Sequence, residues 1–273
     1  PQACMTIMDQ RTGYVKAIVG GRGEKTASLT FNRATDNYSQ PGSTFKILSA
    51  YGPALDLGKI TLATVIKDEP FNYSDGTPLQ NADLTYHGDV TVRQAIINSI
   101  NIPAVKVLTE ITPKAGFDYL KKLGFTKLSE ESDVIQPLAL GGITYGVSDL
   151  ELTAAYAAIA NGGQYRKPVF YTKVTDSKGN VLIDYTETKA TQVFKASTAS
   201  LLTSAMEDVV EKGTGIACRL DNMHAAGKTG TTNEAKDLVF AGFTPYYTAA
   251  IWAVYDTHAE FPESDREFHK RLW

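Results

Sequence analysis

The chain has 273 residues, of which 43% are hydrophobic and 10% aromatic, and 27 Lys and Arg against 30 Asp and Glu give a net charge of −3. This apolar content excludes an intrinsically disordered chain, and about 75% of the unfolded surface should become buried. A nearly neutral balance without a basic block argues against nucleic-acid binding. No apolar run reaches the roughly 18 residues of a membrane-spanning helix. We therefore expect a folded protein with a large core.

The first part of the chain predicts a β-hairpin followed by a helix. Residues 5–8 and 14–19 form the expected strands around a turn at 9–13. Pro41-Gly42 then breaks the chain, and apolar residues recur at helical spacing after it. This pattern predicts a helix that begins at Ser43.

The middle of the chain predicts helices, and a polar, turn-rich segment lies at 67–89. The expected helices cover 91–98, 104–110, 115–123 and 150–160. Ser148 to Glu151 reads as a capping box ahead of the last of these. Because this helix is apolar nearly all round, we expect it to be buried on every side.

The last third returns to strands. Its expected elements are a hairpin at 169–175 and 181–185, a helix at 197–212, strands at 227–232, 239–244 and 248–255, and a terminal helix at 267–273. Strand groups at both chain ends most simply join into one sheet. We therefore predict an α+β fold, an antiparallel sheet flanked by helices (about 1–42 and 165–273) with an inserted all-helical subdomain (about 43–164). A cleft between the two parts is the natural place for a site.

The first chemical motif is Ser43-Thr44-Phe45-Lys46. Positions i and i+3 share a helix face, so the Ser43 hydroxyl and the Lys46 amine should lie within reach. A neutral Lys46 could take the hydroxyl proton. Near pH 7 this requires its pKa to fall by about 3 from about 10.4, through burial or a second cation. Alone the motif is unspecific, because an exposed serine and lysine at this spacing are common.

The second motif is Ser99-Ile100-Asn101, at the break between two predicted helices. Ser99 offers a hydroxyl that can pass a proton. Asn101 offers a carbonyl that can orient a lysine and an amide that can hold a substrate carbonyl. Alone this motif is weaker still, since serine and asparagine are ordinary helix-boundary residues.

The third motif is Lys228-Thr229-Gly230-Thr231 at the start of a predicted strand. Gly230 would let a substrate backbone lie against an edge strand. The Thr231 N–H can donate to an oxyanion, and Lys228 with the two threonine hydroxyls can bind a carboxylate. A phosphate-binding GxxxxGK[ST] loop is excluded, because position 222 is asparagine and a strand follows instead of a helix.

Other chemistries are poorly represented. No GxSxG elbow and no HExxH motif occurs. We expect the four histidines to lie in polar loops at the surface. They are His87, His224, His258 and His269. Cys4 and Cys218 are expected to be isolated small hydrophobic residues, without a disulfide scaffold or a zinc site.

The order of the three motifs, at residues 43, 99 and 228, is the order found in class A β-lactamases and penicillin-binding proteins. The sequence resembles the transpeptidase domain of class A, bifunctional penicillin-binding proteins. The segments that carry this resemblance are 32–35, 40–46, 86–95, 99–105, 139–142, 146–152, 155–163, 213–215, 227–232 and 240–245.

The resemblance implies a serine D,D-transpeptidase that cross-links peptidoglycan stem peptides, with D,D-carboxypeptidase activity as a possible side reaction. In this family the residue matching Ser43 attacks the carbonyl between the two terminal D-alanines, and the one matching Lys46 acts as the base. Ser99 would relay a proton to the leaving group with help from Lys228. Asn101 would orient Lys46 and the substrate. An amine of a neighbouring stem peptide would then take the acyl group.

The resemblance also implies the binding groups. The backbone N–H groups of Ser43 and Thr231 would form the oxyanion hole, and Thr229, Gly230 and Thr231 would bind the substrate and its terminal carboxylate. β-Lactams would acylate Ser43. No cofactor, metal or nucleic acid is implied.

The same family carries a glycosyltransferase domain and a membrane anchor, for which this chain leaves no room. We expect residues 1–273 to be a single transpeptidase domain. It would belong to a longer protein, held at the extracytoplasmic face of the bacterial membrane by an N-terminal segment outside this chain.

Two alternatives share the motifs. A β-lactamase or D,D-carboxypeptidase would hydrolyse the acyl-enzyme, and a class A β-lactamase needs a glutamate to activate water. Glu151 is the only acid near the expected stretch, and it reads as a helix-capping residue. A penicillin-sensing domain would be acylated without turnover and would be distinguished by a membrane signalling segment in its full-length gene.

Overall fold

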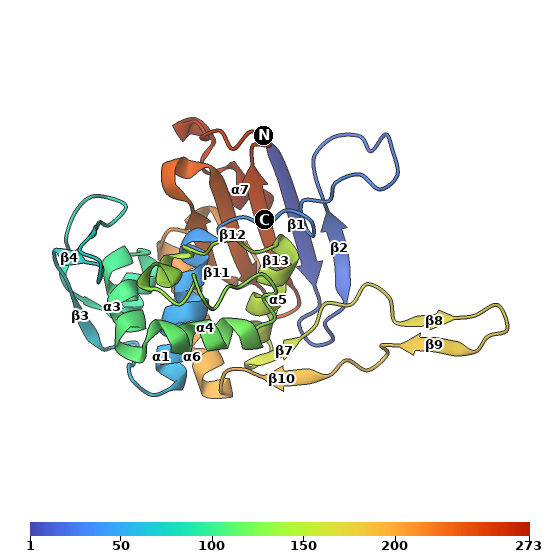
Figure 1. The fold of residues 1–273 in the computed structure, drawn as a ribbon, viewed down its shortest axis with the longest axis horizontal. Coiled ribbons are helices and arrows are strands. Elements are labelled where there is room, and N and C mark those ends of the chain that lie inside the picture. The colour runs from blue at the N-terminus through green and yellow to red at the C-terminus, as the bar shows by residue number, and fades with distance from the viewer.

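The computed structural model describes residues 1–232 and 234–273. Its centre is a five-stranded antiparallel sheet in the order β11-β12-β13-β1-β2 (Figure 1). The strands are β1 Gln2–Met8, β2 Val15–Val19, β11 Ala226–Thr231, β12 Asp237–Phe243 and β13 Thr248–Val254. β1 pairs along its length with β13, from Gln2 opposite Val254 to Met8 opposite Thr248. The two chain ends therefore build one sheet, which confirms the predicted α+β class.

Helices cover both faces of this sheet. They are α1 Gly52–Asp56, α2 Val92–Ile97, α3 Asn101–Ile111, α4 Pro113–Lys122, α5 Asp149–Ala160, α6 Ala196–Lys212 and α7 Phe268–Leu272. α5 packs across β1, β12 and β13, and α6 along β11. Val239 belongs to the main core, whereas the ring of Phe240 lies 4.9 Å from that of Trp273. Because neighbouring residues of a strand point to opposite faces, the C-terminal segment covers the second face.

α5 is the buried helix that the sequence predicts. The Ser148 hydroxyl accepts from the Glu151 N–H at 3.2 Å, and the Glu151 carboxylate accepts from the Ser148 N–H at 3.0 Å. This reciprocal pair is the predicted capping box. The α5 side chains from Leu152 to Ile159 are buried.

The helix predicted at Ser43 is not a regular α-helix. Gly42–Thr44 is a 3₁₀ turn, Lys46–Tyr51 is a π-helix, and α1 follows. Pro53 has no N–H to give to the carbonyl four residues back, and the Gly52 N–H donates to the Ile47 carbonyl, five residues back. Local π-helical turns of this kind occur frequently at functional sites.

The inserted part at about 43–164 is not all-helical as predicted, because its polar, turn-rich segment contains two short strand pairs. β3 Val65–Asp68 pairs with β6 Gly88–Thr91, and β4 Phe71–Asn72 with β5 Pro78–Leu79. These strands have two to four residues, too few for a clear apolar alternation.

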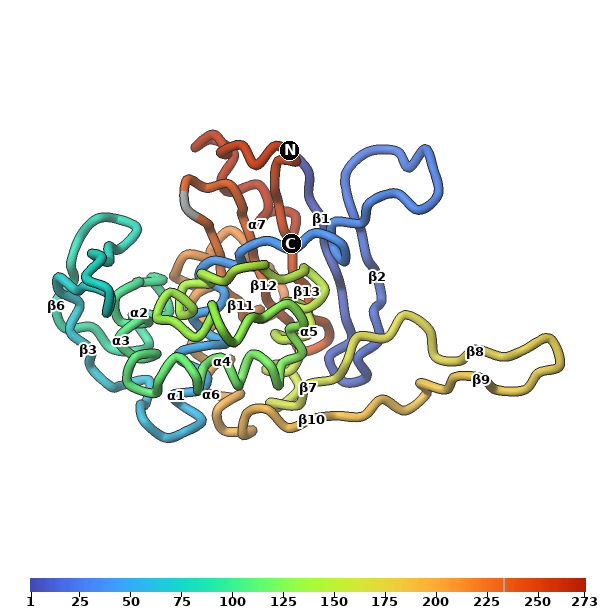
Figure 2. The backbone as a smooth tube through the Cα atoms, viewed as in Figure 1, coloured from blue at the N-terminus to red at the C-terminus, as the bar shows by residue number. Residues whose placement is uncertain are grey.

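A long hairpin extends from the body of the molecule. It consists of β8 Lys173–Thr175 and β9 Val181–Asp184, with β7 Gln164–Arg166 pairing with β10 Ala190–Gln192 at its base (Figures 1 and 2). The hairpin of β8 and β9 confirms the prediction. The pairing of β7 with β10 at its base was not predicted. Within the described ranges, none of the helices has both the length and the apolar character needed to cross a bilayer.

Candidate active site

One wall of the site is built around Lys46, which is completely buried at the start of the π-helix. Its Nζ lies 2.6 Å from Asn101 Oδ1, 2.5 Å from the Ser99 carbonyl oxygen and 3.3 Å from Ser99 Oγ. Ser99 sits between α2 and α3 with a φ of 56°. A left-handed conformation costs a non-glycine residue about 1–3 kcal/mol and is retained where the surroundings enforce it. Here both oxygens of Ser99 lie beside the Lys46 amine.

The other wall is β11, the edge strand of the central sheet. Lys228 is completely buried, and its Nζ donates to Ser99 Oγ at 2.8 Å. The same Nζ lies 3.1 Å from the Thr229 carbonyl oxygen, and Thr229 Oγ1 lies 2.8 Å from Thr214 Oγ1. The Ser99 hydroxyl therefore lies between two lysine amines, one from each wall.

Burial changes the charge of both lysines. Removal from water, followed by the nearby charge of Lys228, holds the pKa of Lys46 well below its usual value. Removal from water and the charge of Lys270 lower the pKa of Lys228 to about 7. Burial and a second amine thus lower the pKa of Lys46 in the direction that a lysine base requires.

Two glycines let the walls meet at Ser43, which is half-buried in the 3₁₀ turn. A Cβ on Gly42 would lie 2.8 Å from the Thr231 carbonyl oxygen, and Gly42 has a φ of 56°. A Cβ on Gly230 would lie 2.4 Å from the Pro41 carbonyl oxygen. Side chains at these positions would push β11 away from the turn. The backbone of Thr231 consequently lies against the residue that precedes Ser43.

The structure brings the sequence-predicted residues to one place in two groups. Hydrogen bonds join Lys46, Ser99, Asn101, Lys228 and Thr229. Ser43, Gly230 and Thr231 lie at the junction of the two walls. In the described part of the chain, the partners of the Lys46 amine are Ser99 and Asn101, and no hydrogen bond joins it to Ser43 Oγ. Such catalytic hydrogen bonds often form only when substrate is bound.

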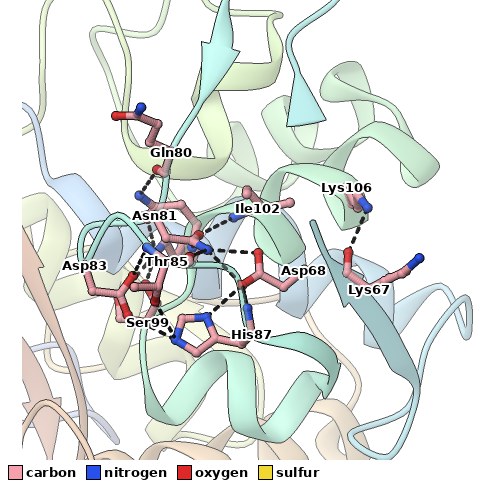
Figure 3. Close-up of polar contacts among 12 residues, drawn as sticks. Lys67, Asp68, Gln80, Asn81, Asp83, Thr85, His87, Ser99, Ile102 and Lys106 are labelled. Carbon is pink, nitrogen blue, oxygen red and sulfur yellow. Dashed lines mark hydrogen bonds and ion pairs between the residues drawn. The ribbon is translucent and has the colours of Figure 1, made fainter. Parts of the chain in front are cut away.

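Several neighbours of the site were missed at the sequence level. They are Asp68, Asn81, His87, Thr214 and Lys270, and Figure 3 shows the first three. The expectation that all histidines lie in surface loops is wrong for His269, which is 1% exposed in α7. It also misses the role of His87, whose ring binds Asp68. The burial of His269 was missed because α7 has only five residues, too few for a periodic pattern that identifies a buried face.

Two other predictions hold. Cys4 and Cys218 are buried and unbridged. Glu151 is a capping residue whose carboxylate also accepts from Thr126 Oγ1 at 2.6 Å. The only acid considered for a β-lactamase mechanism is therefore engaged at the start of α5.

Residues 3–268 match the family described as penicillin binding protein transpeptidase domain. The chain belongs to this family. Its membership agrees with the three motifs and with the hydrogen bonds that connect Lys46 and Lys228 through the Ser99 hydroxyl.

Relatives of this transpeptidase domain carry penicillin-binding protein names. Penicillin-binding protein 1A of Clostridium botulinum is 37% identical over the whole of this chain, which covers 34% of that protein. Penicillin-binding protein 4 of Bacillus subtilis is 37% identical, with 94% of this chain and 40% of the relative covered. The chain thus spans about a third to two fifths of the length of these relatives.

Solved structures share its fold. Penicillin-Binding Protein 1A from Haemophilus influenzae superposes with a TM-score of 0.83 at 23% identity, covering 99% of this chain and 47% of that one. The PonA1 protein from Mycobacterium tuberculosis, solved in complex with penicillin V, gives a TM-score of 0.83 at 26% identity, covering 95% and 70%.

Proposed function

We propose that this transpeptidase domain is a serine D,D-transpeptidase that cross-links peptidoglycan stem peptides through an acyl-enzyme on Ser43. The observation that carries the proposal is the continuous set of hydrogen bonds from Lys46 through Ser99 to Lys228 beside the Ser43 turn. A serine nucleophile needs a base, and a lysine with a lowered pKa supplies one.

In acylation, Ser43 Oγ attacks the carbonyl carbon between the two terminal D-alanines and gives its proton to Lys46. The N–H groups of Ser43 and Thr231 stabilise the oxyanion that forms. The C–N bond then breaks, and D-alanine leaves with a proton that Ser99 relays from Lys46. Lys228 keeps the Ser99 hydroxyl oriented through their 2.8 Å contact.

In the second half-reaction, an amine of a neighbouring stem peptide attacks the acyl-enzyme carbonyl. Its proton returns through the same groups, a new amide bond forms and Ser43 is released. A β-lactam enters the first half-reaction in the same way, but its leaving nitrogen stays attached through the opened ring. The substrate carboxylate would be bound by Lys228, Thr229 and Thr231, and the Lys228 amine lies 3.3 Å from Thr229 Oγ1.

We infer two further features from the family. Because related proteins are two to three times longer than this chain, the domain would work within a longer, membrane-anchored protein at the extracytoplasmic face. The solved relative in complex with penicillin V supports β-lactams as inhibitors here.

The test uses a pentapeptide ending in D-Ala-D-Ala and an excess of an amine acceptor, with both products followed by mass spectrometry. We expect D-alanine and the acceptor adduct in equal amounts, and neither product with Ser43→Ala. Cross-linking by Ser43→Ala at the parental rate would contradict the proposal.

The lifetime of the penicillin adduct separates the alternatives. A transpeptidase keeps its β-lactam adduct, whereas a β-lactamase hydrolyses it within seconds. Because the Glu151 carboxylate is bound to Ser148 and Thr126, we expect a long-lived adduct. A penicillin-sensing domain would also keep its adduct, but it would not form the cross-linked product.

A further inference from the structure

Helix α3 carries Asn101 at its first position but has no cap of its own. Its N-cap residue is Ile100, whose side chain cannot accept a hydrogen bond. The first N–H groups of a helix have no partner inside it. Here Asn81 supplies the missing acceptor, because its Oδ1 accepts from the N–H groups of Asn101 at 3.0 Å and Ile102 at 3.2 Å. A residue from the loop after β5 thus fixes the backbone of Asn101.

The same loop fixes the side chain of Asn101. Asn101 Nδ2 donates to the Gln80 carbonyl oxygen at 2.9 Å, which leaves Oδ1 facing the Lys46 amine at 2.6 Å. The Asn101 amide is therefore oriented at both ends, because Gln80 accepts from its Nδ2 and Lys46 donates to its Oδ1. Any movement of Gln80 and Asn81 changes the position of the group that holds the catalytic lysine.

Asn81 is held in turn by a buried carboxylate. Its Nδ2 lies 2.9 and 2.8 Å from the two oxygens of Asp68 and 2.8 Å from the Thr85 carbonyl oxygen. The Asp68 side chain has no exposed surface. It also accepts from the backbone N–H of His87 at 2.9 Å and lies 2.7 Å from His87 Nδ1 (Figure 3). A buried polar group needs such hydrogen-bond partners to offset its removal from water.

His87 lies at the rim of this cluster, between two carboxylates. Its Nε2 lies 3.0 Å from Asp83 Oδ2, so the two ring nitrogens face two carboxylates. The hydrogen bond to Asp68, with the charges of Asp83 and Asp68, raises the pKa of His87. The His87 side chain is 35% exposed, so it can be exchanged without opening the core.

We propose that Asp68, Asn81 and His87 form a positioning relay that sets Asn101, and through it Lys46, for acylation. None of the three touches the reacting atoms, so they are positioning residues that act through Asn101. The proposal rests on the proposed function, because it assigns them a part in the acylation of Ser43.

The experiment measures acylation of the 273-residue chain by a fluorescent penicillin, separating the acylation rate constant from the dissociation constant of the preceding complex. Displacing a catalytic group by about 1 Å can cost about 100-fold in rate. We therefore expect Asn81→Ala to lower the acylation rate constant by about that factor. The dissociation constant of the preceding complex should not change. His87 acts on Asn101 only through Asp68 and Asn81, so we expect a smaller loss of about 10-fold in His87→Ala.

His87→Asn is the conservative variant. Its amide nitrogen can take the place of Nδ1 and keep a donor on Asp68, so it should recover most of the rate lost in His87→Ala. His224→Ala is the matched control, since His224 is an exposed histidine outside the relay. It should acylate at the parental rate.

Three outcomes would overturn the relay. They are an unchanged rate constant in Asn81→Ala, a loss that appears only in the dissociation constant, and a His87→Asn variant as slow as His87→Ala. Should Asn81→Ala not fold, the His87 pair decides alone. Failure of the parental chain to be acylated at Ser43 would instead contradict the proposed function, so the two failures are distinguishable.

Discussion

The two walls of the site are held by different means. In β11, each residue from Ala226 to Thr231 is paired with one from Phe243 to Leu238, so Lys228 is placed by a backbone ladder. In the opposite wall, Asn101 is placed by the Asn81 side chain, which accepts from its backbone N–H, and by the Gln80 carbonyl, which accepts from its side chain. A ladder uses backbone groups that every non-proline residue has, whereas a side-chain network depends on the identity of each member. Substitutions should therefore act on the sheet wall through shape and on the helical wall through polar contacts.

The largest effect should come from the base on the helical wall. We expect Lys46→Met to lower the rate of acylation by about 10³- to 10⁴-fold, because the variant has no group to accept the Ser43 proton. Lys59→Met is the control, since Lys59 is exposed. Measured with the fluorescent penicillin, a Lys46→Met rate within tenfold of the parent would remove Lys46 as the base.

The next effect tests the sheet wall through shape alone. We expect Gly230→Ala to slow acylation by about 100-fold, because its methyl group must displace the Pro41 carbonyl and with it the Ser43 turn. Gly23→Ala serves as the control, since its methyl group meets no neighbour within 4 Å and its φ of 99° confines any backbone strain to an exposed loop. Parental acylation by Gly230→Ala would show that the close contact between the walls is not required.

A smaller effect concerns stability. The unfolded chain keeps Lys228 charged up to about pH 10.4, whereas the folded chain releases that proton at about 7. The folded state thus binds fewer protons between these values, so the stability cost of Lys228 is complete below pH 7 and fades as the pH rises. We expect Lys228→Met to raise the free energy of unfolding at pH 6 by about 1–4 kcal/mol.

Urea unfolding at pH 6 and pH 10 measures this difference. The gain should shrink at pH 10, because this pH lies close to the unfolded pKa of about 10.4, so little free energy is needed there to keep Lys228 deprotonated in the folded state. A gain of equal size at both pH values, or a loss at pH 6, would mean that burial does not lower the pKa of Lys228 in the folded state.

The smallest effect is a shift in a pH profile. The rate of acylation should rise as Lys46 loses its proton, well below the usual lysine range, and fall near pH 7 as Lys228 loses its charge. Lys270→Met removes the second cause of the lowered Lys228 pKa, so the falling limb should move to higher pH. If the falling limb of the pH profile did not move in Lys270→Met, that limb would report the titration of a group other than Lys228.

The sequence located the candidate catalytic motifs but not the residues that hold them in place. Ser43, Lys46 and Lys228 were predicted because short motifs occur in a characteristic order, and the sheet because strand-like segments separated by turns lie at both ends of the chain. Asn81 and Asp68 carry no local signal, since their role exists only when the 65–91 segment folds against α3. The π-helix was missed because helical spacing of apolar residues does not distinguish i→i+4 from i→i+5 hydrogen bonding.

The central claim is that Ser43 is the nucleophile between the two walls. The direct test is to incubate the chain with penicillin, digest it and locate the adduct by mass spectrometry. We predict a single modified peptide that contains Ser43, and no adduct in Ser43→Ala. An adduct on another residue, or undiminished labelling of Ser43→Ala, would contradict the account.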